Sequence, residues 1–184
     1  VSINFQFFGL LSLCILIFLC HSLSLVFFSD NATYDSFFAS FAKEAKKLSY
    51  VALSEKNTND KEWQRKINIH NERRPKNWKL IETTDLLNTL NQEDGPLLID
   101  SIGGFVIESI DKENKEWLAM MDSLIFLLKK RRSLTFIVGE QVGWSLVSEY
   151  KIGNTYIERI GELQKRITKI SKDNWLAING RAIK

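Results

Sequence analysis

The sequence predicts an α/β fold in which helices flank a mostly parallel β-sheet. Short apolar runs typical of buried strands, such as residues 96–102, alternate along the chain with amphipathic segments of helical periodicity. Apolar residues make up 45% of the 184 residues, which is enough to bury the core of one domain. The net charge of +3 is too small for the strongly basic surface of a typical nucleic-acid binder, so we expect no nucleic acid as a partner.

Each element is expected from a local pattern. Apolar or β-branched runs predict strands at residues 24–29, 49–54, 96–102, 134–138 and 174–179. Helical periodicity predicts helices at residues 36–48, 60–74, 116–132 and 155–170. Asn59 and Glu62 form a capping-box pattern at the start of the second helix, and Pro75 should end it.

The first 22 residues are expected to form an apolar extension ahead of a domain over residues 23–184. No Asp, Glu, Lys or Arg occurs before Asp30, and the run is long enough for a transmembrane helix. The lysines that follow would then place the domain in the cytoplasm. The run also fits a buried first strand or a mis-assigned start, so a cytoplasmic protein is the main expectation and a membrane-anchored one the alternative. Cys14 and Cys20 lack metal-ligand spacing, so neither zinc nor a disulfide framework is expected.

One histidine lies in a setting that two interpretations explain. His70 follows Trp63 and Ile67 at helical spacing, so it could be the last residue of a buried helical stripe. A neutral imidazole is also a good nucleophile toward phosphorus, and Arg73 and Arg74 could neutralise the phosphates as charge develops. From these residues alone both interpretations stay open.

Five blocks of the sequence resemble segments of one enzyme family. The block DKEWQRKINIHNERRPKNWKLIET, residues 60–83, resembles the histidine signature of the bifunctional adenosylcobinamide kinase / adenosylcobinamide-phosphate guanylyltransferases. The blocks LLIDSIGGFV, VGEQVGWSLVSEY, YIERIGELQKRI and WLAINGRAIK resemble further segments of that family, in the same order and with similar spacing. The resemblance implies a P-loop NTPase-like fold.

The resemblance also implies an activity and a set of site residues. The family phosphorylates adenosylcobinamide and then transfers GMP from GTP to that phosphate, which assembles the nucleotide loop of cobalamin. His70 matches the histidine that becomes guanylylated. The positions that match nucleotide-contacting segments are Ser54, Glu55, Asn71, Glu72, Arg73, Arg74, Glu82 and Asp100. Asp100 also matches a carboxylate that would hold Mg²⁺, so the implied cofactor is Mg²⁺ with GTP or ATP as substrates, and the implied assembly is a homo-oligomer.

The segment where the family has its phosphate-binding loop departs from the family pattern. A P-loop needs glycines, a lysine and a hydroxyl that binds Mg²⁺. The residues here are Ser29, Asp30, Asn31, Ala32, Thr33, Tyr34, Asp35, Ser36 and Phe37. Two carboxylates repel a triphosphate, and Ser36 stands where the lysine belongs. We therefore predict a transferase with an impaired kinase step. The alternative is a pseudoenzyme that binds a partner or a corrinoid without turnover.

Overall fold

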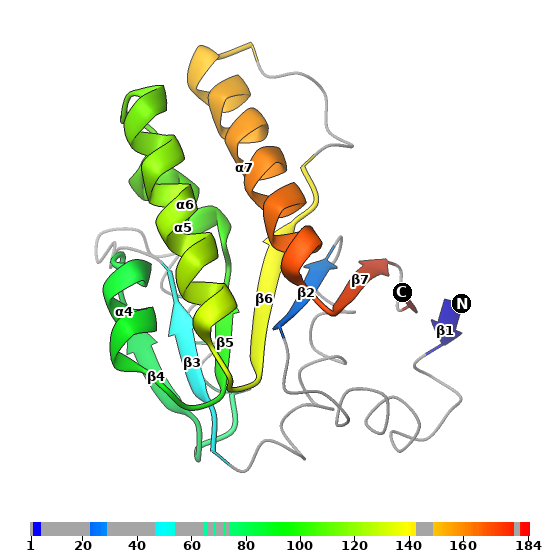
Figure 1. The fold of residues 1–184 in the computed structure, drawn as a ribbon. Coiled ribbons are helices and arrows are strands. Elements are labelled where there is room, and N and C mark those ends of the chain that lie inside the picture. The colour runs from blue at the N-terminus through cyan, green and yellow to red at the C-terminus, as the bar shows by residue number, and fades with distance from the viewer. Residues whose placement is uncertain are drawn as a thin grey trace.

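The computed structural model describes residues 2–4, 23–28, 47–53, 65, 68, 72, 74–142, 149–178 and 181–184. In these residues the chain forms one sheet of eight strands in the order β1-β8-β7-β2-β6-β5-β3-β4 (Figure 1). Neighbouring strands from β7 to β4 in that order are parallel, whereas β8 is antiparallel to β7 and to β1. The predicted α/β class with a mostly parallel sheet is confirmed.

Most of the strands follow the apolar runs of the sequence. The strands are β1 (Ser2–Asn4), β2 (Leu23–Phe28), β3 (Ser49–Ala52), β4 (Lys79–Glu82), β5 (Leu97–Asp100), β6 (Thr135–Glu140), β7 (Asp173–Ile178) and β8 (Arg181–Ile183). The sequence patterns do not predict β1, β4 or β8. β4 begins and ends in exposed charged residues, β1 and β8 have three residues each, and their positions depend on pairing with neighbouring strands.

Four helices that the structure describes in full cover one face of the sheet. They are α4 (Leu86–Gln92), α5 (Gly103–Glu108), α6 (Asn114–Lys130) and α7 (Lys151–Ile170), as Figure 1 shows. α6 and α7 match the two long helices that the periodicity predicts, whereas α4 and α5 are too short to be predicted from it. Asp85 caps α4 by accepting a hydrogen bond of 3.0 Å from the Asn88 N–H. Within the predicted helix 60–74, the described residues 65, 68 and 72 are helical, whereas Arg74 lies in a bend, so the helix ends before the predicted residue.

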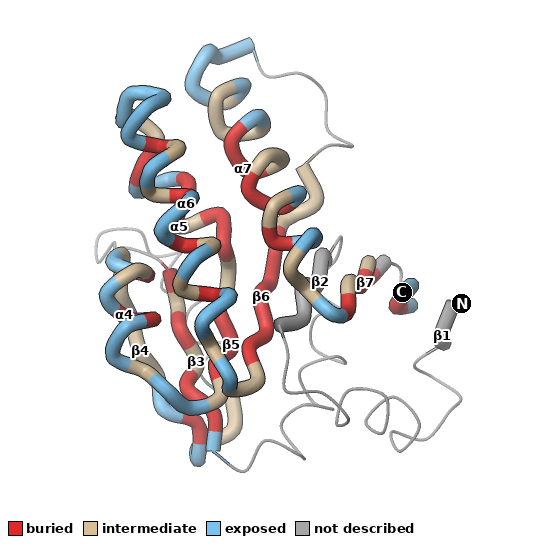
Figure 2. Tube along the Cα trace, in the orientation of Figure 1, coloured by how far each residue is buried: buried red, intermediate tan, exposed pale blue. Residues whose placement is uncertain are grey.

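Strand residues alternate between two apolar clusters on opposite faces of the sheet. The helix-side cluster takes Val51, Leu97, Ile99 and Ile137 from the strands and packs them against buried residues of the four helices. Figure 2 shows that the buried positions of α6 and α7 lie on the sides that face the sheet. The second cluster, called the Trp78 cluster below, comprises Leu48, Trp78, Leu98, Phe136 and Val138, with Tyr50 and Leu134 packed against it.

The described part of the apolar N-terminal run consists of β1 and β2. β1 pairs with β8, so the two ends of the chain lie beside each other at one edge of the sheet (Figure 1). Residues 5–22 lie outside the described residues, and the predicted boundary at residue 22 stays a prediction. None of the helices among the described residues combines the length and the hydropathy that crossing a bilayer requires.

Candidate functional site

The carboxyl ends of the parallel strands meet along one edge of the sheet, called the carboxyl edge below. Ala52, at the end of β3, is in register with both Asp100 of β5 and Glu82 of β4. Two of the predicted site residues, Asp100 and Glu82, therefore lie on either side of the end of β3. Their backbones are separated by two strand spacings of about 5 Å each. The Leu53 N–H donates to the Asp100 carbonyl oxygen at 3.1 Å, which fixes the chain immediately before the predicted Ser54.

A second carboxylate lies at the same edge, one strand further along. Glu140 ends β6 and is in register with Phe28, the last residue of β2. Because β6 lies between β2 and β5, Glu140 lies between Asp100 and the point where the segment beginning at Ser29 leaves the sheet. The end of β2 is where the family resemblance would place a phosphate-binding loop, so the two carboxylates lie at the edge where that resemblance implies a nucleotide.

The Asp100 carboxylate is connected through Tyr50 to the segment that carries His70. The Tyr50 hydroxyl donates a hydrogen bond to Asp100 Oδ2. On the face of the Tyr50 ring, the guanidinium carbon of Arg74 lies 5.6 Å from the ring centroid, within the range of a cation–π contact. Arg74 is four residues beyond His70, so the end of the histidine segment contacts the same tyrosine that holds Asp100.

The turn after Arg74 is anchored to the sheet. The Trp78 N–H donates to the Pro75 carbonyl oxygen at 3.1 Å, and the Trp78 side chain is buried in the cluster that bears its name. The Lys79 N–H then donates to the Leu48 carbonyl oxygen at 3.0 Å, which begins the pairing of β4 with β3. The end of the histidine segment therefore lies on the face of the sheet opposite α4–α7.

Glu140 is held by the turn that follows Asp100. The Ser101 hydroxyl donates to Glu140 Oε1, and the Gly103 N–H donates to Oε2 at 3.2 Å. Gln164 of α7 donates to the Glu140 carbonyl oxygen at 2.8 Å. Burial raises the pKa of the Glu140 carboxyl, the hydrogen bond from Ser101 opposes that shift, and the charge of Asp100 adds to it. The pKa of the neighbouring Tyr156 hydroxyl is raised by burial and by the charge of Glu140.

Two glycines allow this close packing. A Cβ added at Gly103 would lie 2.4 Å from both Glu140 Oε1 and the Tyr156 hydroxyl oxygen. A Cβ added at Gly104 would lie 2.1 Å from the Leu53 carbonyl oxygen. Both distances are shorter than any real carbon contact, so α5 can approach the ends of β3 and β6 because these two positions lack side chains.

Several predicted site residues lie outside the described residues. They are His70, Ser54, Glu55, Asn71, Arg73 and the whole segment Ser29–Phe37. Among the described ones, Asp100 and Arg74 are half-buried and joined through Tyr50, whereas Glu72 and Glu82 are exposed. The contact of Arg74 with Tyr50 and the register of β3 bring Arg74, Asp100 and Glu82 to one region.

The sequence interpretation did not single out Tyr50, Ser101, Glu140 or Tyr156. A signal for Glu140 was present, because the run TFIVGE ends in a carboxylate just as the run LLID does. Parallel strands that end in acidic residues bring those residues to one edge. Tyr50 and Tyr156 carry no such signal, since an aromatic residue in a strand or helix is ordinarily part of the core.

The described residues suit a magnesium ion that a nucleotide brings with it. Mg²⁺ binds oxygen ligands and usually takes one or two carboxylates, with phosphates and water completing its shell. Asp100 would supply one such carboxylate, and its Oδ2 accepts a hydrogen bond from Tyr50. Among the residues that the structure describes, no group of three or more His, Cys, Asp or Glu side chains could form an all-protein metal site.

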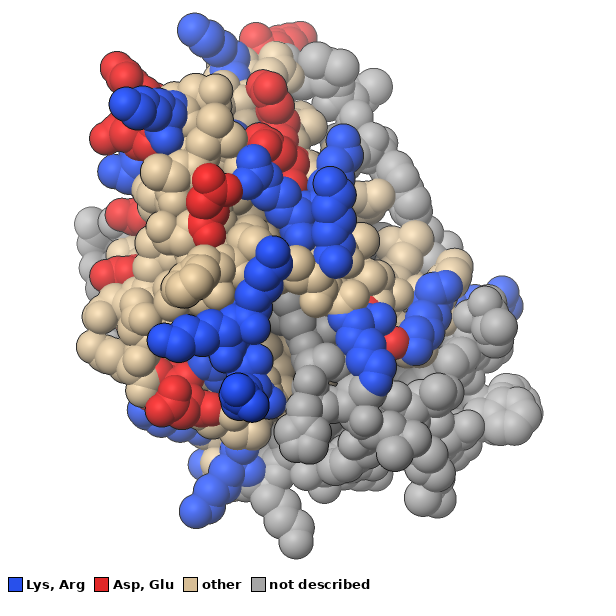
Figure 3. Space-filling view, in the orientation of Figure 1, with Lys and Arg blue, Asp and Glu red and all other residues tan. Residues whose placement is uncertain are grey.

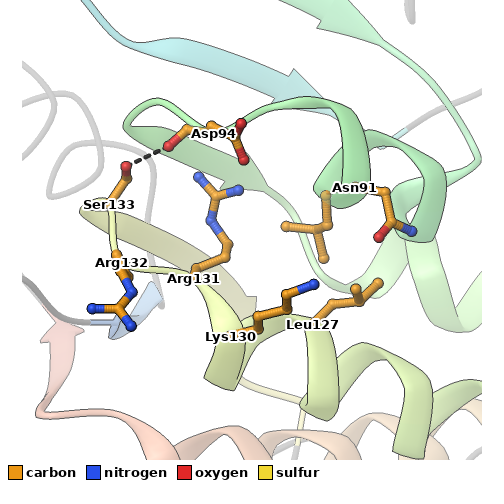
Figure 4. A pocket seen from close by; sticks show the side chains of 8 residues that line it. Asn91, Asp94, Leu127, Lys130, Arg131, Arg132 and Ser133 are labelled. Atoms are coloured by element: carbon orange, nitrogen blue, oxygen red, sulfur yellow. Dashed lines mark hydrogen bonds between the residues drawn. The ribbon is translucent and has the colours of Figure 1, made fainter.

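A pocket lined by basic residues lies at the edge of the sheet where the parallel strands begin, and its central arginine serves the fold. It measures about 390 Å³, and Lys130, Arg131, Arg132, Ser133, Asn91 and Asp94 are among the residues that line it (Figure 4). Its central guanidinium, that of Arg131, donates to the Glu93 and Gly95 carbonyl oxygens and, at 2.9 Å, to Thr135 Oγ1. Figure 3 shows lysines and arginines interspersed with acidic residues over the helical face. The pocket therefore lacks an uncommitted central cation for a ligand.

Comparison with known proteins was informative about family and fold. The family model described as "Cobinamide kinase / cobinamide phosphate guanyltransferase" matches residues 35–184. The fold is similar to a solved structure described as a prototypical ATPase from the type III secretion system of pathogenic bacteria, with a TM-score of 0.56 and 11% identity, over 86% of this chain and 51% of that chain. This chain thus spans about half the length of that ATPase, and the similarity concerns the fold, which confirms the predicted P-loop NTPase-like architecture. No curated protein sequence matches the chain significantly.

Proposed function

The chain belongs to the cobinamide kinase / cobinamide phosphate guanyltransferase family, and on that premise we propose that it transfers GMP from GTP to adenosylcobinamide phosphate through a guanylylated His70. The reaction would take place in the cytoplasm during assembly of the nucleotide loop of cobalamin. The observation that carries the proposal is the connection from Arg74 through Tyr50 to Asp100. It joins the end of the histidine segment to the carboxylate expected at the nucleotide.

The proposed reaction has two steps at one phosphorus atom. In the first, a ring nitrogen of His70 attacks the α-phosphorus of GTP, a P–N bond forms, and the bond to the β-phosphate oxygen breaks to release pyrophosphate. In the second, a phosphate oxygen of adenosylcobinamide phosphate attacks the same phosphorus. The P–N bond then breaks and the imidazole is regenerated with GMP joined to the corrinoid phosphate.

The chain's own residues would orient the nucleotide and balance its charge. The Arg74 guanidinium lies at the end of the histidine segment and would offset negative charge on the phosphates, together with Arg73. Asp100 would hold Mg²⁺, which supplies charge neutralisation at the phosphates when it is bound. The Tyr50 hydroxyl, which donates to Asp100 Oδ2, would orient this carboxylate toward the metal.

The kinase step of the family is expected to be weak in this chain. The segment that follows β2 carries Asp30 and Asp35 and lacks a lysine, so it offers the γ-phosphate repulsion where a P-loop offers attraction. Guanylyl transfer depends on the α-phosphate and on the histidine segment. It is therefore the chemistry that the remaining residues support best.

A covalent-labelling assay tests the proposal. Purified protein is incubated with Mg²⁺ and GTP labelled with ³²P at the α-phosphate, beside His70→Ala and the matched control His21→Ala, which changes the other histidine of the chain. We expect acid-labile, alkali-stable label, as in a phosphoramidate, on the wild type and on His21→Ala but not on His70→Ala.

The opposite result supports the pseudoenzyme alternative. If the wild type takes up no label while circular dichroism and cooperative unfolding show that it is folded, the transferase proposal is wrong. Label that persists in His70→Ala would mean that another side chain is the nucleophile. Transfer of ³²P from the γ-phosphate of GTP to adenosylcobinamide at a rate similar to that of guanylylation would instead contradict the predicted impairment of the kinase step.

A further inference from the structure

We propose that Tyr50 is a positioning residue that joins the two halves of the site, its hydroxyl orienting the Asp100 carboxylate and its ring packing against the Arg74 end of the histidine segment. This inference rests on the guanylyl transfer proposed above. Tyr50 belongs to neither of the motifs that carry the family resemblance to His70 and Asp100, and its role follows from its contacts.

The position of Tyr50 in the sheet suits the first task. Tyr50 is in register with Leu98, so Asp100 lies two residues further along the neighbouring strand on the same face of the sheet. A strand side chain as long as tyrosine can reach this diagonal neighbour when it leans along the strand. The hydroxyl thereby reaches Oδ2 of Asp100 and favours one orientation of the carboxylate.

The ring of Tyr50 suits the second task. One part of the ring packs against the Trp78 cluster, and its face lies under the guanidinium of Arg74 at 5.6 Å from centroid to Cζ. Arg74 is half-buried, which strengthens a cation–π contact relative to an exposed one. Because Trp78 and Lys79 fix the chain a few residues later, the ring and the turn together determine where the histidine segment ends.

The two tasks depend on different parts of the side chain, so two substitutions separate them. Tyr50→Phe removes the hydroxyl and keeps the ring, whereas Tyr50→Leu removes both. Arg74→Met removes the guanidinium that contacts the ring and leaves Tyr50 itself unchanged. Tyr150→Phe is the matched control, because Tyr150 is an exposed tyrosine that precedes α7 and is distant in sequence from Asp100.

Metal binding reports on the hydroxyl. The dissociation constant of Mn²⁺ is measured by electron paramagnetic resonance in the presence of the α,β-methylene analogue of GTP, which cannot transfer its α-phosphate. Loss of a hydrogen bond to a metal-ligating carboxylate typically lowers the affinity for the metal by about tenfold or more. We expect about a tenfold weaker Mn²⁺ complex for Tyr50→Phe and no change for Tyr150→Phe. Equal Mn²⁺ affinity in Tyr50→Phe and wild type would overturn this half of the proposal, as would a wild type that binds no Mn²⁺ with the analogue.

Amide hydrogen exchange reports on the ring without any nucleotide. We expect the amides of residue 74 and residues 76–78 to exchange about tenfold faster in Tyr50→Leu and in Arg74→Met, and at the wild-type rate in Tyr50→Phe. Arg74→Met leaves the Trp78 cluster unchanged, so a fold defect in Tyr50→Leu would not obscure the result. Unchanged exchange in Arg74→Met would overturn the ring contact.

These readouts separate the failure of this proposal from the failure of the proposed function. A wild type without label at His70, but with the expected changes in Mn²⁺ affinity and exchange, would refute guanylyl transfer and keep the positioning role of Tyr50. A labelled wild type whose Tyr50 variants match it in both measurements would refute the positioning role and keep guanylyl transfer. Where labelling occurs, Tyr50→Phe should raise the Mg²⁺ concentration for half-maximal labelling and leave the rate at saturating Mg²⁺ unchanged.

Discussion

The two edges of the sheet use charged side chains in opposite ways. At the amino edge, where the parallel strands begin, Glu93 accepts hydrogen bonds from Lys79 and, at 3.1 Å, from Ser49. The pKa of Glu93 is lowered, chiefly by the hydrogen bond from Lys79, while burial opposes the shift. At the carboxyl edge, Glu140 has its pKa raised by burial, and its described partners are neutral hydrogen-bond donors.

This difference shows that an ionised carboxylate stabilises the fold at the amino edge and destabilises it at the carboxyl edge. Arg131 and Lys79 surround Glu93 with positive charge, so ionised Glu93 stabilises the fold. Among the described residues, Glu140 faces the like charge of Asp100, so ionised Glu140 costs stability. Unfavourable electrostatics of this kind are typical of functional sites, because such a carboxylate is stabilised when a ligand brings a cation to it.

The largest loss of stability is expected from a substitution at Gly104, where the carboxyl edge is most closely packed. Gly104→Ala would bring a Cβ within 2.1 Å of the Leu53 carbonyl oxygen and 2.6 Å of its Cβ, so α5 or the end of β3 must move. Overpacking of this kind costs about 3 kcal/mol. Urea denaturation should show that loss of unfolding free energy, and labelling at His70 should fall with it.

Gly95→Ala is the matched control at the amino edge. A Cβ there meets no described atom within 4 Å. The substitution should change the free energy of unfolding by less than about 1 kcal/mol, because a glycine that gains a methyl group without a clash loses only backbone freedom in the unfolded chain. Equal losses at the two glycines would mean that the edges do not differ in packing.

An intermediate effect is expected at Glu140, and it depends on pH. Because the pKa of Glu140 is raised in the folded protein, the folded state binds more protons than the unfolded state between the two pKa values. The stability of the wild type should therefore fall as pH rises from the ordinary glutamate value of about 4.3 through the raised value. Glu140→Gln lacks this loss, so its free energy of unfolding relative to the wild type should increase from pH 4 to pH 7.

Urea titrations at each pH provide the measurement, with Glu158→Gln as the charge-matched control on the exposed side of α7. The control should follow the wild type across the range. A Glu140→Gln variant whose difference from the wild type stays constant with pH would show that Glu140 ionises at the same pH in both states. The contrast between the two edges would then be lost.

The arrangement of the sheet could be predicted from sequence because its signals are local. The runs around Leu98 and Phe136 are buried on both faces, and the stripe of Ile160, Leu163 and Ile167 faces the sheet, as the periodicity indicates. The edge that carries the site followed from the same reasoning, because Asp100 ends a buried run. β1, β4, α4, α5 and β8 were not predicted, because short elements form through pairing and packing with distant residues.

The partners within the site could not be predicted, since they are separated widely in sequence. Tyr50 and Asp100 are 50 residues apart, and Ser101 and Glu140 are 39 apart. The register of parallel strands sets both contacts, and register depends on the whole sheet. The requirement for glycine at position 104 likewise depends on how closely α5 approaches the end of β3. The role of His70 stays a prediction that the labelling assay addresses.

The smallest effect is expected at Glu93, with the opposite dependence on pH. Because the pKa of Glu93 is lowered in the folded state, its contribution to stability is present above the ordinary glutamate value and is lost as pH falls through the lowered value. Glu93→Gln should therefore be less stable than the wild type at pH 7, and the two should converge in acid. The Lys79 side chain is 63% exposed, so the solvent-screened pair contributes about 0.5 kcal/mol. High salt should reduce the difference at pH 7, since an exposed pair is screened. If Glu93→Gln and Glu140→Gln change with pH in the same direction, the two edges do not handle charge differently.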